Sequence, residues 1–289
     1  MNYKKKFCVA PGSRIKLDKI DASFTDKHES HEHALPEIQA FSQYMHDYQY
    51  LMYAESKRSL LICLQGRDAA GKDGTINHVL SSMNPQGCTV TGFKAPSKEE
   101  AAHDFLWRYH NHTPAKGQVA IFNRSHYEDV LIQRVHNWVP KKVWSKRYEH
   151  INHFEKMLYD NGTYILKFYL HIDPDEQLER FKQRIADNSR HWKISENDYA
   201  ERPFWDSYTK AFEDALSNCS TDYAPWFVIP SNHKWFRNLA ISKIVVETFE
   251  ALHMKFPEPT VDIDEINKKY HEILEEEIEA KGKKHKKSK

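Results

Sequence analysis

The residues with the clearest chemical potential follow a short apolar run that ends near residue 65. Gly66, Gly71 and Lys72 have the spacing of a phosphate-binding loop, in which two glycines flank four residues and a lysine follows. Glycines let the backbone approach a ligand closely, and the N–H groups at the start of a helix favour an anion there. The run at 60–64 predicts a strand before the loop, and residues 75–83 predict a helix after it. The stretch therefore predicts a phosphate-binding site.

Two acidic residues make this loop unusual. A Walker-type loop ends in a lysine and a Ser or Thr whose hydroxyl holds Mg²⁺, but here Asp73 replaces that hydroxyl. Asp68 would be repelled by phosphates unless a metal lay between them, so we interpret it as a metal ligand or a general base. The alternative is a structural residue that caps the helix. We expect phosphate or nucleotide contacts from the remaining loop residues, Arg67, Ala69, Ala70, Gly74 and Thr75.

A second polar group follows the apolar run at 119–122. Metal-handling strands of phosphate-loop folds usually end in Asp, whereas this run ends in Asn123, which shifts the metal role to Asp68 and Glu128. Arg124 follows a strand end, where open α/β sheets bind ligands, so we expect it to clamp a phosphate. The alternative for Arg124 is a surface ion pair with a nearby acid.

A third group is a dense run of basic residues in an otherwise balanced chain. It comprises Arg180, Lys182, Arg184, Arg190 and Lys193. A mobile lid that closes on phosphates needs this composition, so we expect a lid over about residues 184–203. The alternative is a solvated, charged helix.

Composition limits the class of protein. The chain has 289 residues and a formal net charge of +1, so its overall charge does not draw it to nucleic acid. Its four cysteines are scattered without a C-x-x-C pair, as is typical of reduced thiols and not of a zinc site or disulfide framework. No apolar run approaches the ~20 residues of a membrane span, and the N-terminal segment lacks the apolar core of a signal peptide. We therefore expect a cytoplasmic protein with neither a membrane nor a nucleic-acid partner.

The elements that must position these groups alternate along the chain. Apolar, β-rich runs lie at 60–64, 88–93, 118–122, 163–172 and 226–229, and segments with helical spacing separate them. This alternation predicts one α/β domain with a mostly parallel sheet covered by helices on both faces. The expected fold class is a P-loop kinase-like three-layer sandwich with a five-stranded sheet and a helical lid, similar to thymidylate kinase.

Three regions are expected. Residues 1–35 are polar and predict an irregular arm that wraps the core or a neighbouring subunit. Residues 36–258 predict the domain that carries the loop, with a first helix at 37–57 and another that starts at a capping box, Ser97 with Glu100, and continues to about Tyr109. Residues 259–289 pass from acidic to basic and predict a solubilising helical tail.

Five segments of the chain resemble the polyphosphate kinase 2 family. They are GRDAAGKDGTI, NPQGCTVTGFKAPS, FNRSHYEDVL, RIADNSRHWKISENDYAERPFWDSY and STDYAPWFVIPSNHKWFRN, in the family's order and across about residues 35–255. Asn123 with Glu128 resembles class III, whose members phosphorylate both AMP and ADP. Members restricted to nucleoside diphosphates have Asp and Asn at these two positions.

The resemblance implies an activity and its ligands. Inorganic polyphosphate is the expected donor, AMP and ADP are the acceptors that yield ADP and ATP reversibly, and guanine nucleotides are further acceptors. The expected cofactor is Mg²⁺, with Mn²⁺ as a substitute, and two metal ions bridge donor and acceptor. The expected assembly is a homo-oligomer, either a dimer or a tetramer.

The resemblance also assigns roles residue by residue. The catalytic residues are Asp68, Lys72, Arg124, Glu128 and Arg184, of which Asp68 and Glu128 handle metal. The polyphosphate path is lined by Lys72, Arg184, Arg190 and Lys193. Nucleotide and phosphate contacts fall to Gly66, Arg67, Ala69, Ala70, Gly71, Asp73, Gly74, Thr75, Asn123 and Tyr127.

Two other functions remain open at this point. One is an ATP-dependent nucleoside monophosphate kinase of the thymidylate kinase type, which has the same fold and loop. The other is a regulator that binds a polyanion or a nucleotide without turnover. The residues alone establish only a phosphate-loop phosphotransferase.

Overall fold

Strand β1 (Ser59–Gly66) occupies the centre of a five-stranded sheet of order β2-β3-β1-β4-β5, in which every pairing is parallel. The computed structural model describes residues 1–287. The other strands are β2 (Cys88–Gly92), β3 (Val119–Asn123), β4 (Thr163–His171) and β5 (Trp226–Pro230). The expected α/β class and the five expected strands are confirmed.

The register of the sheet brings two of the polar segments together. Leu64 of β1 pairs with Asn123 of β3, so the two strands end at the same edge. The glycine loop leads from β1 into α3 (Lys72–Leu80), and Arg124 leaves β3 beside it. The amide of Arg124 donates to the carbonyl oxygen of Leu64 at 3.1 Å, which ties the second segment to the strand that precedes the loop.

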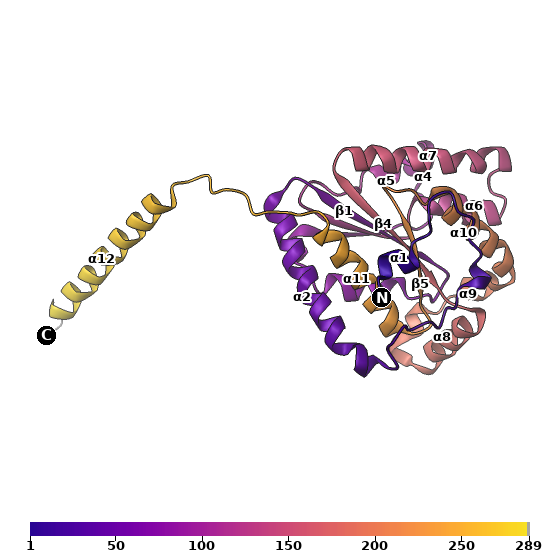
Figure 1. Ribbon diagram of the computed structural model, residues 1–289, viewed down its shortest axis with the longest axis horizontal. Helices are drawn as coiled ribbons and strands as arrows, with labels where there is room; N and C mark the ends of the chain where they lie inside the picture. The colour runs from indigo at the N-terminus through magenta and orange to yellow at the C-terminus, as the bar shows by residue number, and fades with distance from the viewer. Residues whose placement is uncertain (288–289) are drawn as a thin grey trace. The chain divides into compact units, whose positions relative to one another are not determined.

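Helices cover both faces of the sheet (Figure 1). On one face, α2 (His31–Glu55) and α11 (Lys234–Glu250) share a buried apolar cluster with β1 and β3. On the other face, α7 (Lys141–Asp160) and α10 (Trp205–Cys219) bury residues such as Ile151 and Phe212 against β4 and β5. The sheet therefore lies between two helical layers, as expected.

The N-terminal region packs against the core. Helix α1 (Tyr3–Phe7) buries both of its aromatic rings against Phe236 of α11, with centroids 5.7 and 6.1 Å away. Cys8 then forms a single antiparallel bridge with Phe227 of β5, and η1 (Leu17–Lys19) follows. Much of this region is irregular, but its apolar residues fix it to the domain.

Two helix boundaries differ from the expectation. Helix α2 begins at His31 and not near residue 37, because the Ser30 side chain accepts a hydrogen bond from the His33 amide and caps an earlier start. The helix expected from Ser97 to Tyr109 is divided into α4 (Lys98–Ala102) and α5 (Trp107–His110). Asp104 accepts a hydrogen bond from the Leu106 amide at 2.9 Å, and this local turn competes with helix continuation. The capping box of Ser97 and Glu100 is confirmed.

The remaining elements lie near the ends of the strands or in the basic stretch. They are η2 (Pro85–Gly87), η3 (His126–Val130), α6 (Ile132–Val135), α8 (Pro174–Ala186), η4 (Asn188–Lys193), α9 (Glu196–Ala200) and η5 (Arg202–Phe204). We call residues 187–204, which contain η4, α9 and η5, the lid segment.

The chain divides into two compact units, Met1–Met254 and Lys255–Lys289. The second unit contains α12 (Ile263–Lys287), where the Asp262 side chain accepts hydrogen bonds from the amides of Asp264 and Glu265. This agrees with the expected C-terminal helix. None of the helices in residues 1–287 has the length and apolar character that crossing a membrane requires.

Candidate active site

The glycine loop requires glycine at two positions. A Cβ on Gly66 would meet the Leu170 carbonyl oxygen at 3.0 Å, because the loop leaves β1 in close contact with β4. Gly71 has a φ of +104°, and a Cβ there would lie 1.9 Å from a guanidinium nitrogen of Arg237. Both the conformation and the space therefore exclude a side chain at Gly71. The loop closes as a tight bend directly before α3.

Two buried arginines from distant helices hold this bend. Arg180 of α8 donates to the carbonyl oxygens of Ala69 and Ala70 at 2.8 and 2.9 Å. Arg237 of α11 donates to the same Ala70 oxygen at 3.4 Å. Ala69 itself has a positive φ of 62°, an uncommon conformation for a residue with a side chain. The bend is thus strained at one residue and fixed from two sides.

Lys72 begins α3 and turns back over the loop. Its Nζ donates to the carbonyl oxygens of Gly66 and Arg67 at 2.7 and 3.2 Å. Burial and the neighbouring charge of Arg124 lower the pKa of Lys72, against the opposing effect of the carboxylates nearby. The ammonium is therefore held at the start of the helix, where the phosphates of a ligand would also be attracted.

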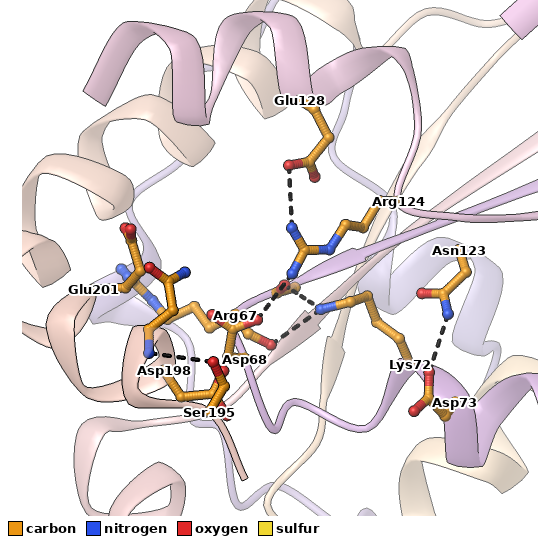
Figure 2. A network of polar contacts seen from close by, with 12 residues as sticks. Arg67, Asp68, Lys72, Asp73, Asn123, Arg124, Glu128, Ser195, Asp198 and Glu201 are labelled. Atoms are coloured by element: carbon orange, nitrogen blue, oxygen red, sulfur yellow. Dashed lines mark hydrogen bonds and ion pairs between the residues drawn. The ribbon is translucent and has the colours of Figure 1, made fainter. Parts of the chain in front are cut away.

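Arg124 joins the loop to the second polar segment (Figure 2). One guanidinium nitrogen lies 3.1 Å from Oδ1 of Asp68, and another lies 3.6 Å from Oε2 of Glu128. Burial tends to lower the pKa of Arg124, but the carboxylates of Glu128 and Asp68 outweigh it and raise the pKa. Arg124 also has a positive φ of 63°. The ion pair expected as the alternative for Arg124 is present, and it faces the loop in the same cavity as Lys72.

A second set of contacts links the end of β3, the start of α3 and the lid segment. Asn123 donates a hydrogen bond to Oδ1 of Asp73 at 3.0 Å. Nζ of Lys193 lies 3.3 Å from Oδ2 of the same Asp73 carboxylate. Burial tends to raise the pKa of Asp73, but these two hydrogen bonds and the charge of Lys193 hold it below its ordinary value. Asp73 therefore connects the end of β3, through Asn123, to the lid segment, through Lys193.

The other basic residues of the third group have different surroundings. Arg184 of α8 pairs with Asp198 of the lid segment, and its Nη1 lies 2.8 Å from Oδ2 of Asp198. Arg190 pairs with Asp187 at 2.8 Å and is largely exposed. Arg180, which belongs to the basic group but precedes the lid expected at 184–203, is buried against the loop, and its guanidinium also donates to the Asn232 carbonyl oxygen at 3.0 Å.

These residues enclose one strongly cationic cavity beside the loop. Its basic lining residues are Lys72, Arg124, Arg180, Arg184, Arg190, Lys193, Lys234 and Arg237. Within residues 1–287, no carboxylate forms an ion pair with Lys234 or Arg237. Burial and the charge of Arg180 lower the pKa of Arg237 to about 9, so the folded chain holds this cation at a cost. A cavity with this surplus of positive charge favours a polyanion.

Two further cavities meet the same pair of residues, Arg124 and Glu128, from the side away from α3. One is lined by apolar and aromatic residues that include Leu131, Tyr208 and Phe212. The other is lined by Phe93, Phe105 and Trp138, among others. Both combine apolar walls with carboxylates and basic side chains, and this mixture suits a nucleotide, with its apolar base and charged phosphate, better than a polyanion.

Three residues expected to contact phosphate or nucleotide do not border the cationic cavity. The Arg67 guanidinium stacks on the Trp205 ring at 3.7 Å and donates to Thr209, so its charge anchors α10 to the loop. Tyr127 is fully buried, and its hydroxyl donates to Glu155 at 2.9 Å. Thr75 is also fully buried in α3, and its hydroxyl has no hydrogen-bond partner in this structure. The geometry therefore gives Tyr127 a packing role and places Arg67 at the cavity that Leu131 and Phe212 line, whereas Ala69, Gly71 and Gly74 border the cationic cavity.

Two cavity residues were not selected from the sequence. Lys234 and Arg237 lie in the first turn of α11, directly after β5, at the same edge of the sheet as the loop. Both belong to the fifth segment quoted for the family resemblance, but nothing in their spacing indicated a role. The available signal was their position after the last strand, where an open α/β sheet presents its binding edge.

The carboxylates of the site fit a metal that is bound mainly by substrate. Within residues 1–287, no group of three or more His, Cys, Asp or Glu is arranged to hold a metal ion by itself. Mg²⁺ commonly uses one or two carboxylates together with phosphate oxygens and water. Asp68 and Glu128 face one another across Arg124 and supply that number of carboxylates (Figure 2).

Comparisons with known proteins agree on one family. The family model described as Polyphosphate kinase 2 (PPK2) matches residues 24–257. The chain is 46% identical to an AMP/ADP-polyphosphate phosphotransferase of Meiothermus ruber over 263 residues, covering 91% of this chain and 98% of the relative. It is 42% identical to an ADP-polyphosphate phosphotransferase of Rhodopseudomonas palustris, covering 89% and 93% of the two chains.

A solved structure has the same fold over almost the whole chain. The crystal structure of a polyphosphate kinase 2 from Arthrobacter aurescens TC1 matches with a TM-score of 0.91 and 37% identity. The match covers 94% of this chain and 97% of the solved one. The shared fold therefore extends over almost the whole chain.

Proposed function

The chain belongs to the polyphosphate kinase 2 family and is a polyphosphate kinase, and we propose that it transfers phosphate from inorganic polyphosphate to both AMP and ADP. The relative that is 46% identical is named for both acceptors, and the one that is 42% identical is named for ADP. The observation that carries the proposal is the division of the site at Arg124. A cationic cavity borders Arg124 together with the start of α3, and two cavities with apolar walls border Arg124 together with Glu128.

Polyphosphate occupies the cationic cavity in this proposal. Polyphosphate carries about one negative charge per phosphate, and a chain of such charges needs cations spaced along a path and not at a single point. Lys72 and Arg124 meet the reacting end, Arg184 and Lys193 follow from α8 and the lid segment, and Lys234 and Arg237 extend the path at α11. The last two residues add to the path assigned from the sequence.

The acceptor phosphate lies beside Arg124 and Glu128. Transfer of a phosphoryl group requires the attacking and leaving oxygens to be in line and the charge on the group to be cancelled. Lys72 and Arg124 supply positive charge close to the loop, and Arg184 adds to it when released from Asp198. The attacking oxygen of a nucleotide phosphate is already anionic near neutral pH, so no strong general base is needed.

In this proposal Asp68 and Glu128 therefore orient the reacting groups and do not serve as general bases. Asp68 and Glu128 would hold Mg²⁺ together with phosphate oxygens of the substrates, and the ion would supply positive charge that neutralises the phosphates. Arg124 holds both carboxylates in place before substrates arrive, which limits the reorganisation required for transfer. Mn²⁺ is the expected substitute because it has a similar preference for oxygen ligands.

The donor assay separates this function from its rivals. The purified protein is incubated with AMP, Mg²⁺ and polyphosphate in the absence of ATP, and ADP and ATP are quantified. We expect both products. An ATP-dependent kinase of the thymidylate kinase type would form no ADP without ATP, and a non-catalytic regulator would bind polyphosphate without forming either product. The reverse reaction, from ATP to AMP, is measured in the same way.

A further inference from the structure

A fully buried ion pair lies behind the acceptor side of the site. Lys167 is in the middle of β4 and Glu155 is in α7, and neither side chain is exposed to solvent. Nζ of Lys167 lies 2.6 Å from Oε2 of Glu155. Its other two hydrogen bonds go to the Tyr127 hydroxyl at 2.8 Å and the Cys219 carbonyl oxygen at 2.6 Å. All three ammonium hydrogens are therefore satisfied.

The second oxygen of Glu155 reaches the segment that carries Glu128. Oε1 lies 3.0 Å from Nε2 of His126 and accepts a hydrogen bond from the Tyr127 hydroxyl at 2.9 Å. Burial tends to raise the pKa of Glu155, but Lys167 and His126 outweigh it and lower the pKa, so the carboxylate stays charged. The four side chains form one connected polar network inside an otherwise apolar layer.

His126 and Tyr127 lie in the chain between the two residues that meet the substrates. Arg124 and Glu128 face the active-site cavities, while His126 and Tyr127 are fully buried in the core. Arg124 leaves β3 with a positive φ, and η3 follows directly, so the segment is a sharp bend. Ser125 adds a further polar contact, since its hydroxyl accepts a hydrogen bond from the Gln65 side chain at 3.2 Å.

Stability alone is a weak explanation for this network. A buried ion pair usually contributes little net free energy, because removing both charges from water costs about as much as the pair gains. Such a network does fix one arrangement of the backbone, since each alternative leaves a buried charge or hydroxyl without a partner. The backbone fixed here is the one that aims Arg124 and Glu128.

We propose that Lys167 and Glu155, acting through Tyr127 and His126, are positioning residues that hold Arg124 and Glu128 in the orientation that phosphoryl transfer requires. This inference rests on the proposed function, since it assigns the network to the acceptor side of that reaction. The network does not touch the substrates. Its removal should therefore reduce the rate of transfer and leave the binding of polyphosphate unchanged.

Tyr127→Phe is the most conservative test, because it removes one hydroxyl and keeps the buried ring. We expect kcat with AMP and with ADP to fall roughly tenfold, as for a displacement of catalytic groups, with KM for polyphosphate unchanged. Tyr223→Phe is the matched control, because its hydroxyl also bonds to α7, at the Asn152 carbonyl oxygen 3.1 Å away, but remote from the loop. The control should keep the wild-type kcat. Thermal unfolding is recorded for both variants, and rates are compared well below both midpoints.

A double-mutant cycle tests the route of the effect. If the network acts through Glu128, the Tyr127→Phe and Glu128→Gln changes are not additive, and the double variant is little slower than Glu128→Gln alone. Additive losses, or a Tyr127→Phe variant with wild-type kcat, would overturn the inference. If Tyr127→Phe unfolds, Glu155→Gln, which keeps the shape of the side chain, replaces it in the double-mutant cycle with Glu128→Gln. A wild-type protein that is inactive with polyphosphate would instead refute the proposed function.

Discussion

Nζ of Lys193 lies 3.3 Å from Oδ2 of Asp73, and this contact joins the lid segment to the first turn of the helix after the glycine loop. Both residues border the cationic cavity. A bound polyphosphate would offer Lys193 a stronger partner than a half-exposed carboxylate, because phosphate oxygens carry charge along the whole chain. We therefore expect the lid segment to exchange this protein partner for the substrate when polyphosphate binds.

Loss of this lysine should weaken the binding of polyphosphate. We expect Lys193→Ala to raise KM for polyphosphate roughly threefold to tenfold, since one exposed charge contact contributes about 1 kcal/mol, and to change kcat little. Initial rates at several polyphosphate concentrations and at two ionic strengths measure this, and the effect should shrink at high salt. Lys182→Ala is the control, because Lys182 is exposed on α8 and its nearest acid is 4.0 Å away. An unchanged KM in Lys193→Ala would remove Lys193 from the polyphosphate path.

The loop lysine and the loop acid should each affect the chemical step. Lys72→Ala removes the cation closest to the loop carbonyls, and Asp68→Asn removes one of the two carboxylates paired with Arg124. We expect each change to lower kcat by roughly a hundredfold or more, because charge stabilisation supplies most of the catalysis of phosphoryl transfer. Circular dichroism should show an intact fold. Near-wild-type rates in either variant would refute the assignment, and the exposed Lys98 provides the alanine control.

The sheet edge could be predicted from the sequence because its signals are local. The glycine spacing, the apolar runs and Arg124 at a strand end all lie within short windows. The supports of the loop are not local, since Arg180 and Arg237 reach the Ala70 carbonyl oxygen across 110 and 167 residues of sequence. A basic run has the same appearance whether its side chains are exposed or buried. The sequence therefore groups Arg180 with the other cations of the basic run and gives no signal that it supports the loop, and it indicates no role for Arg237.

Tyr127 illustrates the same limit on the acceptor side. The family resemblance implies a nucleotide contact for Tyr127, yet its side chain is buried in the core while Arg124 and Glu128 face the active-site cavities. Which of them turns inward depends on Glu155 and Lys167, which lie 28 and 40 residues further along the chain. The sequence identifies the segment, and the buried partners decide the direction of each side chain.

Glu128 should control the choice between AMP and ADP. The family resemblance places Asn here in members restricted to nucleoside diphosphates, and in this structure Glu128 contacts Arg124 at 3.6 Å. We expect Glu128→Asn to lower kcat/KM for AMP at least tenfold more than it lowers kcat/KM for ADP. The reason is that only the shorter acceptor, AMP, depends on the Glu128 carboxylate. Competition assays with both acceptors and a fixed polyphosphate concentration measure the ratio. An equal loss for both acceptors would show that Glu128 has no part in acceptor choice.

Acidification should destabilise the fold through a buried histidine outside the active site. His78 in α3 lies with Nε2 2.9 Å from the hydroxyl of Ser242 in α11, and burial, followed by the charge of Arg237, lowers the pKa of His78 from 6.5. The unfolded chain therefore takes up a proton at a higher pH than the folded chain does. It follows that this histidine reduces stability as the pH falls below about 6.5, and has no effect above that value.

The comparison uses His78→Gln, which retains a polar group for Ser242 and does not titrate. Denaturant unfolding midpoints are measured from pH 5 to pH 8. We expect the wild type to lose stability below pH 6.5 and the variant to lose less of it, with the two curves parallel at higher pH. His33→Gln, at an exposed position in α2, is the control and should follow the wild-type curve. The same slope below pH 6.5 in His78→Gln and in the wild type would contradict this prediction. Protonation of His78 would then contribute nothing to the free energy of unfolding, and the acid sensitivity would lie in other groups.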